Sequence, residues 1–176
     1  MTGLATIWLE EETRWDDRRV RLSAGPSDAA WIAGVWGKSA HAVVFKGRSV
    51  LLVREADGEW HFPGGRTDPG ETLHQALTRE LIEEAGATLR PDPQLFAAVR
   101  VEFPEETREP QGDPYTAYYI ADLDTLMPEY AGDPALAEQQ IAERCLVPSE
   151  DALALLRPLN RRLLKEALAW RQHSAL

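Results

Sequence analysis

The chain has 176 residues, enough for one domain with a substantial core and too few for two ordinary ones. Its 19 lysines and arginines against 29 aspartates and glutamates give a formal net charge of -10, which disfavours binding to a nucleic-acid polymer or an anionic membrane surface. The single cysteine, Cys145, excludes an intrachain disulfide, and no apolar stretch approaches the roughly 20 residues that span a bilayer. These features favour a soluble, cytoplasmic protein.

The first 38 residues hold four of the six tryptophans and show only short strand-like pieces, so they predict no clear arrangement of elements. We treat residues 1–38 as an N-terminal extension of a core that spans residues 39–172, both within a single domain. The extension could complete the core, cover a binding site or form a dimer contact, and an exposed aromatic patch on it would favour the dimer. The protein is therefore expected to be a monomer or a homodimer.

Residues 42 to 87 predict a hairpin followed by a loop and a helix. Residues 42–45 and 49–53 are apolar, β-branched runs separated by a turn with a central glycine, as in paired strands. Prolines and glycines then mark a loop, after which helix formers predict a helix over about residues 73–85. Thr72 is placed to cap its start, and Gly86 is placed to end it in a left-handed conformation.

One face of this helix is apolar and the neighbouring face is acidic. At about 100° per residue, Leu73, Ala76, Leu77 and Leu81 share an arc, while Glu80, Glu83 and Glu84 share the adjacent one. Their mutual repulsion would be relieved by a hard divalent cation, and the absence of cysteine or histidine from this set favours magnesium or manganese over zinc. The alternative is a solvated acidic face with Arg79 as a local ion-pair partner.

The rest of the chain predicts strands and then two helices that cover the sheet. Three runs have strand character: residues 94–103, 115–123 and 141–147. A long acidic loop with several prolines separates the first two. Ser149 is predicted to cap a helix that runs through Leu156, and Pro158 stands at the start of a second helix with an apolar stripe.

The loop and the helix resemble the Nudix box, written G-x5-E-x7-R-E-U-x-E-E-x-G-U with U an apolar residue. Eight of the nine specified positions are matched in full, by Gly65, Glu71, Arg79, Glu80, Leu81, Glu83, Glu84 and Gly86. The last apolar position departs from the pattern, because Ala87 is smaller than the usual isoleucine, leucine or valine. Residues 60–64 also resemble the strand end that precedes the box in this family, and the likeness extends over about residues 39–170.

The resemblance implies an α/β fold, an α/β/α sandwich with a mixed β-sheet, and a loop-helix-loop motif that holds Mg²⁺, or Mn²⁺, against a diphosphate. Carried over by position, Glu83 and Glu84 are metal ligands, and Glu80 is either a ligand or the base that activates water. The backbone carbonyl of Gly64 is a further ligand. Glu71 pairs with Arg79, either to orient the helix or simply to stabilise the loop.

The resemblance also implies another catalytic glutamate in a loop shortly before the last strand. Glu138 occupies about that position, ahead of residues 141–147. Glu143, Glu105 and Glu106 are competing candidates. Two basic residues near the box, Arg54 and Arg66, are the best placed to bind the remaining phosphate charge.

The activity implied is magnesium-dependent cleavage of a phosphoanhydride bond, in which metal ions neutralise phosphoryl charge and a glutamate activates water. A nucleoside di- or triphosphate is the expected substrate, as in enzymes that clean the nucleotide pool. The alternatives are ADP-ribose, a nucleotide sugar or a dinucleoside polyphosphate. A catalytically silent nucleotide sensor and an isoprenoid-diphosphate isomerase are competing functions. The isomerase would need a catalytic cysteine, whereas Cys145 falls in a predicted buried strand.

Overall fold

A computed structural model describes residues 7–15, 17–28, 37–55, 58–105, 114–128 and 141–174. Seven strands form one curved sheet in the order β1-β2-β8-β9-β3-β4-β10, and three short strands pair with its members. The strands are β1 (Leu9–Trp15), β2 (Arg18–Pro26), β3 (Gly37–Lys46), β4 (Ser49–Glu55), β5 (Trp60–His61), β6 (Gly64–Arg66), β7 (Ala87–Leu89), β8 (Gln94–Glu102), β9 (Tyr115–Leu126) and β10 (Ile141–Pro148). The helices are α1 (Leu73–Ala85), α2 (Ser149–Leu155) and α3 (Pro158–Ser174).

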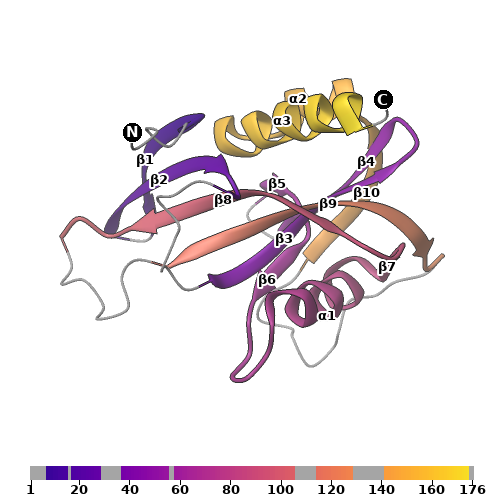
Figure 1. Ribbon diagram of the computed structural model, residues 1–176, viewed down its shortest axis with the longest axis horizontal. Helices are drawn as coiled ribbons and strands as arrows, with labels where there is room; N and C mark the ends of the chain where they lie inside the picture. The colour runs from indigo at the N-terminus through magenta and orange to yellow at the C-terminus, as the bar shows by residue number, and fades with distance from the viewer. Residues whose placement is uncertain are drawn as a thin grey trace.

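The sheet is mixed, because β3 and β9 run parallel while the other strand pairs described are antiparallel. Figure 1 shows α2 and α3 on one side of the sheet and α1 on the other. The predicted α/β fold with helices on both faces of a mixed sheet is therefore confirmed.

Side-chain alternation along β3 divides the core into two clusters. Val43 and Phe45 pack in the larger cluster, which includes Leu163 and Leu164 of α3. Ala42 and Val44 face the opposite way and pack with Leu77 and Leu81 of α1 and with their neighbours in the second cluster. The two helices that carry an apolar stripe in the sequence thus bury it on opposite faces of the sheet.

The predicted hairpin is present, with Phe45 opposite Val50 and Gly47 at a positive φ of 61° in the turn. The strand predicted over residues 115–123 is longer than expected and ends at Leu126. Its extra residues are held by pairing with β7, where Leu126 lies opposite Ala87. That pairing depends on the path of the chain after α1, which cannot be predicted from the local pattern of residues 115–126.

The prediction that Ser149 caps α2 is wrong. Ser149 is the first helical residue, Pro148 occupies the N-cap, and no side chain caps this end. The Ser149 hydroxyl donates instead to the carbonyl oxygen of Arg48, at 2.8 Å. It ties the helix to the β3–β4 turn, a contact 101 positions away in the chain.

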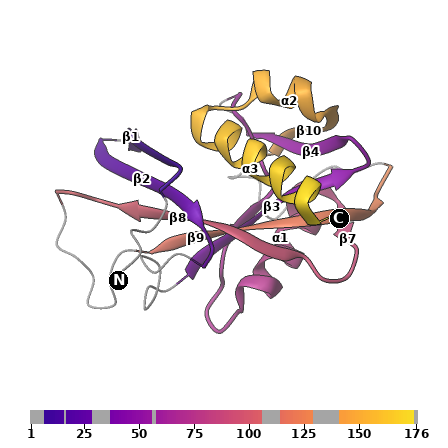
Figure 2. The ribbon, with the colours of Figure 1, turned by 45° about the horizontal axis from the view of Figure 1, so that its top comes forward.

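The N-terminal extension contributes two strands to the edge of the sheet. β1 pairs with β2, and β2 pairs with β8, so the hairpin continues the sheet beyond the predicted core (Figure 2). Val20, Leu22 and Ala24 of β2 are buried in the larger core cluster, so the extension completes part of the core. Trp31 and Trp36 lie outside the described residues. Within the described ranges, no helix has the length and apolar character needed to cross a membrane.

Candidate active site

The predicted helix over residues 73–85 is confirmed residue by residue in α1. At its start the Thr72 hydroxyl accepts the backbone N–H of Gln75 at 3.2 Å, and the Gln75 side chain accepts the backbone N–H of Thr72 at 2.9 Å. This reciprocal capping box satisfies two N–H groups that would otherwise lack partners. At its end Gly86 adopts φ 53°, the left-handed cap expected from the sequence.

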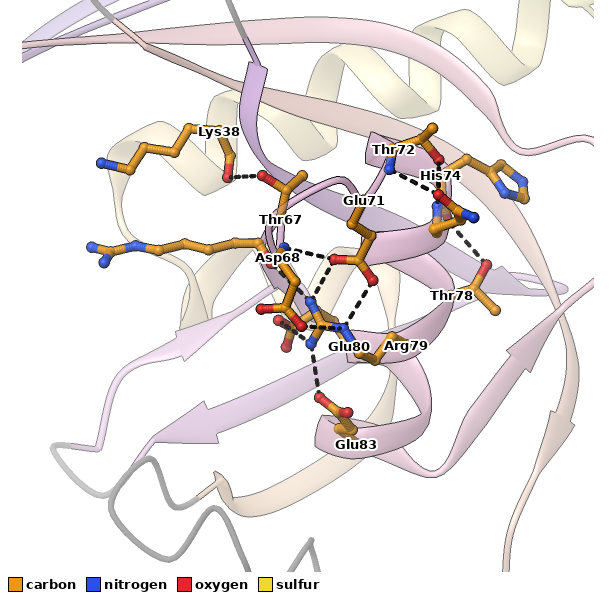
Figure 3. A network of polar contacts seen from close by, with 12 residues as sticks. Lys38, Thr67, Asp68, Glu71, Thr72, His74, Thr78, Arg79, Glu80 and Glu83 are labelled. Atoms are coloured by element: carbon orange, nitrogen blue, oxygen red, sulfur yellow. Dashed lines mark hydrogen bonds and ion pairs between the residues drawn. The ribbon is translucent and has the colours of Figure 1, made fainter.

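Arg79 is the centre of the polar network on α1. Its guanidinium donates to both carboxylate oxygens of Glu71, at 3.0 and 2.9 Å, to Glu80 at 2.8 Å and to Glu83 at 2.9 Å (Figure 3). It also donates to the carbonyl oxygen of Arg66 at 2.9 Å. The hydrogen bonds that Arg79 donates to Glu71, Glu80 and Glu83 raise the pKa of Arg79, and the bonds to Glu71 lower the pKa of that carboxyl group. The expected Glu71–Arg79 pair is therefore present, and two further carboxylates accept hydrogen bonds from the same guanidinium.

Glu80 lies against the backbone of the loop that precedes α1. Its side chain is 15% exposed, and burial raises its pKa despite the bond from Arg79. A Cβ atom added at Gly65 would lie 2.5 Å from the Glu80 carboxylate, so only a glycine there leaves room for this position. The glycine of the box and the first glutamate of the acidic face are thus in direct contact.

Glu84 is fastened to the same loop by a different bond. Its Oε2 atom accepts the backbone N–H of Gly64 at 2.8 Å. β6, which begins at Gly64, is itself paired with β3 through His41 opposite Gly64 and Ala40 opposite Gly65. The carboxylates of α1 are therefore positioned by a short strand that the sheet holds in place.

The donor set fits a hard divalent cation, because it consists of three carboxylates on one helix face without cysteine or histidine. Among the residues described, no three acidic, histidine or cysteine side chains converge closely enough to form a metal-holding group. Glu80 and Glu83 turn toward Arg79, and Glu84 turns toward Gly64. A divalent cation would compete with the Arg79 guanidinium for the first two carboxylates.

The structure places the two predicted phosphate-binding arginines in different surroundings. Arg66 lines a cavity of about 970 Å³ next to the box. Arg54 does not belong to the described lining of that cavity; it donates to Glu143 of β10 and stacks over Trp60, with 5.2 Å from Cζ to the ring centroid. Glu143, a candidate for the additional catalytic glutamate, is therefore occupied by an ion pair.

None of the other candidates for the additional catalytic glutamate contacts the carboxylates of α1 among the residues described. Glu138 and Glu106 lie outside the described residues. Glu105 is exposed just after β8. Cys145 lies in β10, and burial raises the pKa of its thiol, as expected for an inert cysteine.

Four basic residues that line the cavity beside Arg66 were not singled out from the sequence: Arg14, Arg18, Lys38 and Arg157. They come from β1, β2, β3 and the turn before α3. No local spacing joins them, because the sheet order brings them together. Lys38 is the nearest to the box, since its carbonyl oxygen accepts the backbone N–H of Thr67 at 3.0 Å.

A family model described as the NUDIX domain matches residues 35–169. The chain belongs to the Nudix family. The predicted resemblance is thereby confirmed, and α1 is its Nudix helix. The two N-terminal strands lie outside the matched segment.

Relatives and solved structures support the same family. The human 8-oxo-dGDP phosphatase is 48% identical over 55 residues, which cover 29% of this chain and 17% of that protein. The RNA pyrophosphohydrolase of Erwinia tasmaniensis is 42% identical over 55 residues, which cover 31% of each. The chain thus matches well under half the length of these curated relatives. A Bacillus subtilis pyrophosphohydrolase structure aligns over 93% of this chain and 97% of its own, with a TM-score of 0.62 and 19% identity, and so shares the Nudix fold.

Proposed function

We propose that this Nudix protein is a magnesium-dependent hydrolase that cleaves a phosphoanhydride bond in a nucleoside di- or triphosphate. The observation that carries the proposal is the gathering of Glu80, Glu83 and Glu84 on one helix face, against the loop from Gly64 to Arg66. A protein that only bound nucleotides would have little use for three carboxylates that repel one another. The printed names of the two curated relatives, a phosphatase and a pyrophosphohydrolase, are in keeping with this activity.

In the proposed mechanism, Glu83 and Glu84 would hold the cation together with the backbone carbonyl of Gly64, and Glu80 would either be a further ligand or accept the proton of the attacking water. Bound Mg²⁺ would neutralise charge on the phosphoryl oxygens and polarise the water. Arg66, which lines the cavity, would bind the phosphate oxygens whose charge the cation does not neutralise. Glu71 positions Arg79, whose guanidinium keeps the acidic face together when the cation is absent.

Two further site residues are proposed from their positions in the sequence. Glu138 is proposed as the additional catalytic glutamate because it precedes β10 in the sequence, and Arg54 as a second phosphate ligand because it lies near the end of β4, close to the box in sequence. Engagement of Arg54 would require it to leave Glu143. Substituting each residue and measuring KM and kcat separates the roles, since loss of a phosphate ligand raises KM and loss of a base lowers kcat.

We expect purified protein to release phosphate or pyrophosphate from members of a substrate panel only when Mg²⁺ or Mn²⁺ is present. The panel contains nucleoside di- and triphosphates, 8-oxo-dGDP, ADP-ribose, a nucleotide sugar, a dinucleoside polyphosphate and a 5′-triphosphorylated RNA. The product locates the broken bond, and chelation of the metal should stop the reaction. Binding of nucleotide and metal without turnover of any member would instead favour the silent nucleotide sensor.

Replacing Arg79 with glutamine should lower Tm by roughly 4–8 °C, because about 2 kcal/mol is lost when three carboxylates lose their shared cation. In thermal unfolding, saturating Mg²⁺ should raise Tm more in Arg79→Gln than in wild type, since the carboxylates no longer face a competing guanidinium. The matched control is Arg162→Gln, which removes a single i,i+4 partner of Glu166 on α3 and should change Tm little. Equal Mg²⁺ shifts in Arg79→Gln and wild type would contradict a cation site at these glutamates.

A further inference from the structure

The last turn of α1, residues 82–85, carries two of the three carboxylates of the acidic face. Glu83 and Glu84 stand at the end of the helix where the aligned peptide dipoles already place partial negative charge. α1 itself has no basic residue in this turn to offset that charge. Because the last carbonyl groups of a helix have no partners inside it, a turn of this kind tends to fray unless other parts of the chain hold it.

The basic group that α1 lacks comes from Arg144 of strand β10. Its guanidinium donates to the carbonyl oxygen of Ala85, the last residue of α1, and to that of Met127, just after β9. The backbone N–H of Met127 in turn donates to the carbonyl oxygen of Gly86 at 2.9 Å. A closed ring of hydrogen bonds therefore joins the end of α1 to β9 and β10, two strands that are not neighbours in the sheet.

The register of β10 explains why this side chain reaches α1. Arg144 lies opposite Val53 of β4, and Val53 is buried in the core cluster that contains Leu77 and Leu81 of α1. Residues directly opposite each other on antiparallel strands project from the same face of the sheet. Leu146, two residues further along β10, also packs against that cluster. The Arg144 side chain therefore projects on the α1 side of the sheet.

Glu84 is consequently fixed at two points. Its carboxylate accepts the backbone N–H of Gly64 at 2.8 Å, which orients the side chain. The next residue, Ala85, is held through its carbonyl oxygen by Arg144, which orients the backbone. Both contacts exist before any cation is bound. A site that is ordered in advance binds more tightly, because less conformational entropy is lost on binding.

We propose that Arg144 is a positioning residue for the cation site: it holds the last turn of α1 so that Glu83 and Glu84 are ready to bind Mg²⁺ or Mn²⁺. The inference rests on the cation site of the proposed function. In this role Arg144 acts through the backbone of α1 and contacts neither the cation nor the substrate. Lysine in its place would keep the positive charge but lose the planar fork that reaches two carbonyl oxygens.

The test measures Mn²⁺ binding to Arg144→Lys and to wild type without nucleotide, from the electron paramagnetic resonance signal of the unbound ion. Because the substitution keeps the charge, a change in affinity reports on the position of the carboxylates. We expect about fivefold weaker binding by Arg144→Lys, equivalent to about 1 kcal/mol, as the fraction of molecules with an ordered last turn falls to about one fifth. Unchanged Mn²⁺ affinity in Arg144→Lys would overturn the positioning role.

The matched control is Arg161→Lys, at the end of a helix without any residue of the proposed cation site. Arg161 of α3 also donates to two backbone carbonyl oxygens, those of Leu153 and Leu156 at the end of α2, at 2.7 and 3.0 Å. Thermal unfolding should show a similar small fall in Tm for both variants, whereas Mn²⁺ affinity should fall only in Arg144→Lys. Equal weakening of Mn²⁺ binding in both variants would mean a general loosening of the fold, and would also overturn the positioning role.

This binding measurement needs no turnover, so its outcome is separate from that of the proposed hydrolase. Weaker Mn²⁺ binding by Arg144→Lys, in a protein that hydrolyses no member of the substrate panel, would support the positioning role and contradict the hydrolase. Metal-dependent hydrolysis together with equal Mn²⁺ affinities for Arg144→Lys and wild type would do the reverse. Failure of wild type to bind Mn²⁺ would overturn both.

Discussion

Replacing Glu84 with glutamine is expected to lower kcat/KM about a thousandfold, equivalent to about 4 kcal/mol of transition-state stabilisation, while the fold is retained. The amide oxygen of glutamine can still accept the N–H of Gly64, which Glu84 accepts at 2.8 Å, so the loop keeps its attachment to α1. What the substitution removes is the negative charge that would hold the cation. Initial rates with Mg²⁺ measure the loss, and thermal unfolding verifies that Tm is unchanged within a few degrees.

The matched control for this charge change is Glu150→Gln. Glu150 is at the start of α2, and its side chain is 78% exposed with only a 3.9 Å contact to Arg48. Rates should stay within about twofold of wild type, because an exposed pair of this kind contributes little. If Glu84→Gln retained wild-type turnover under saturating Mg²⁺, the acidic face of α1 would not be the metal site, and the hydrolase mechanism proposed for it would have to be abandoned.

The Nudix helix could be predicted to the residue because every signal that defines it is local. Thr72 and Gly86 end it with caps that depend on one turn of chain, and its apolar stripe repeats at helical spacing. The arrangement of its charges was harder to predict. Helical spacing places Arg79 four residues from Glu83, but the simultaneous bonds to Glu71 and Glu80 depend on how the preceding loop folds back.

The outer strand of the N-terminal hairpin, β1, could not be predicted because this edge strand lacks the usual apolar alternation. In β1 no residue is fully buried, and three successive glutamates, Glu10 to Glu12, replace the expected pattern. Pairing with β2, and the ion pairs from Arg19 and Arg21 to Glu12, hold it in place. The basic cavity could not be predicted for a different reason: its residues are far apart in sequence and come together only through the order of the strands in the sheet.

Replacing Gly64 with alanine is expected to destabilise the protein by about 4 kcal/mol, the largest of the stability effects predicted for single substitutions. Gly64 has φ +139°, a backbone conformation that residues with a side chain rarely adopt. An added Cβ would lie 2.2 Å from the carbonyl oxygen of Ala40 and 2.5 Å from the Cα of His41. These are backbone atoms of β3, which is held on its other side by β9 and cannot move aside as a side chain would. Tm should fall by roughly 8–16 °C.

The comparison with Gly47→Ala isolates the steric part of this effect. Gly47 also has a positive φ, of 61°, but no atom would lie within 4 Å of an added Cβ, so about 1 kcal/mol is expected from backbone conformation alone. Chemical denaturation of the two variants gives the difference directly. A loss in Gly64→Ala no larger than in Gly47→Ala would mean that β6 can separate from β3. In that case the N–H that Gly64 offers to Glu84 would not be fixed by the sheet, and the carboxylates would owe their position to α1 alone.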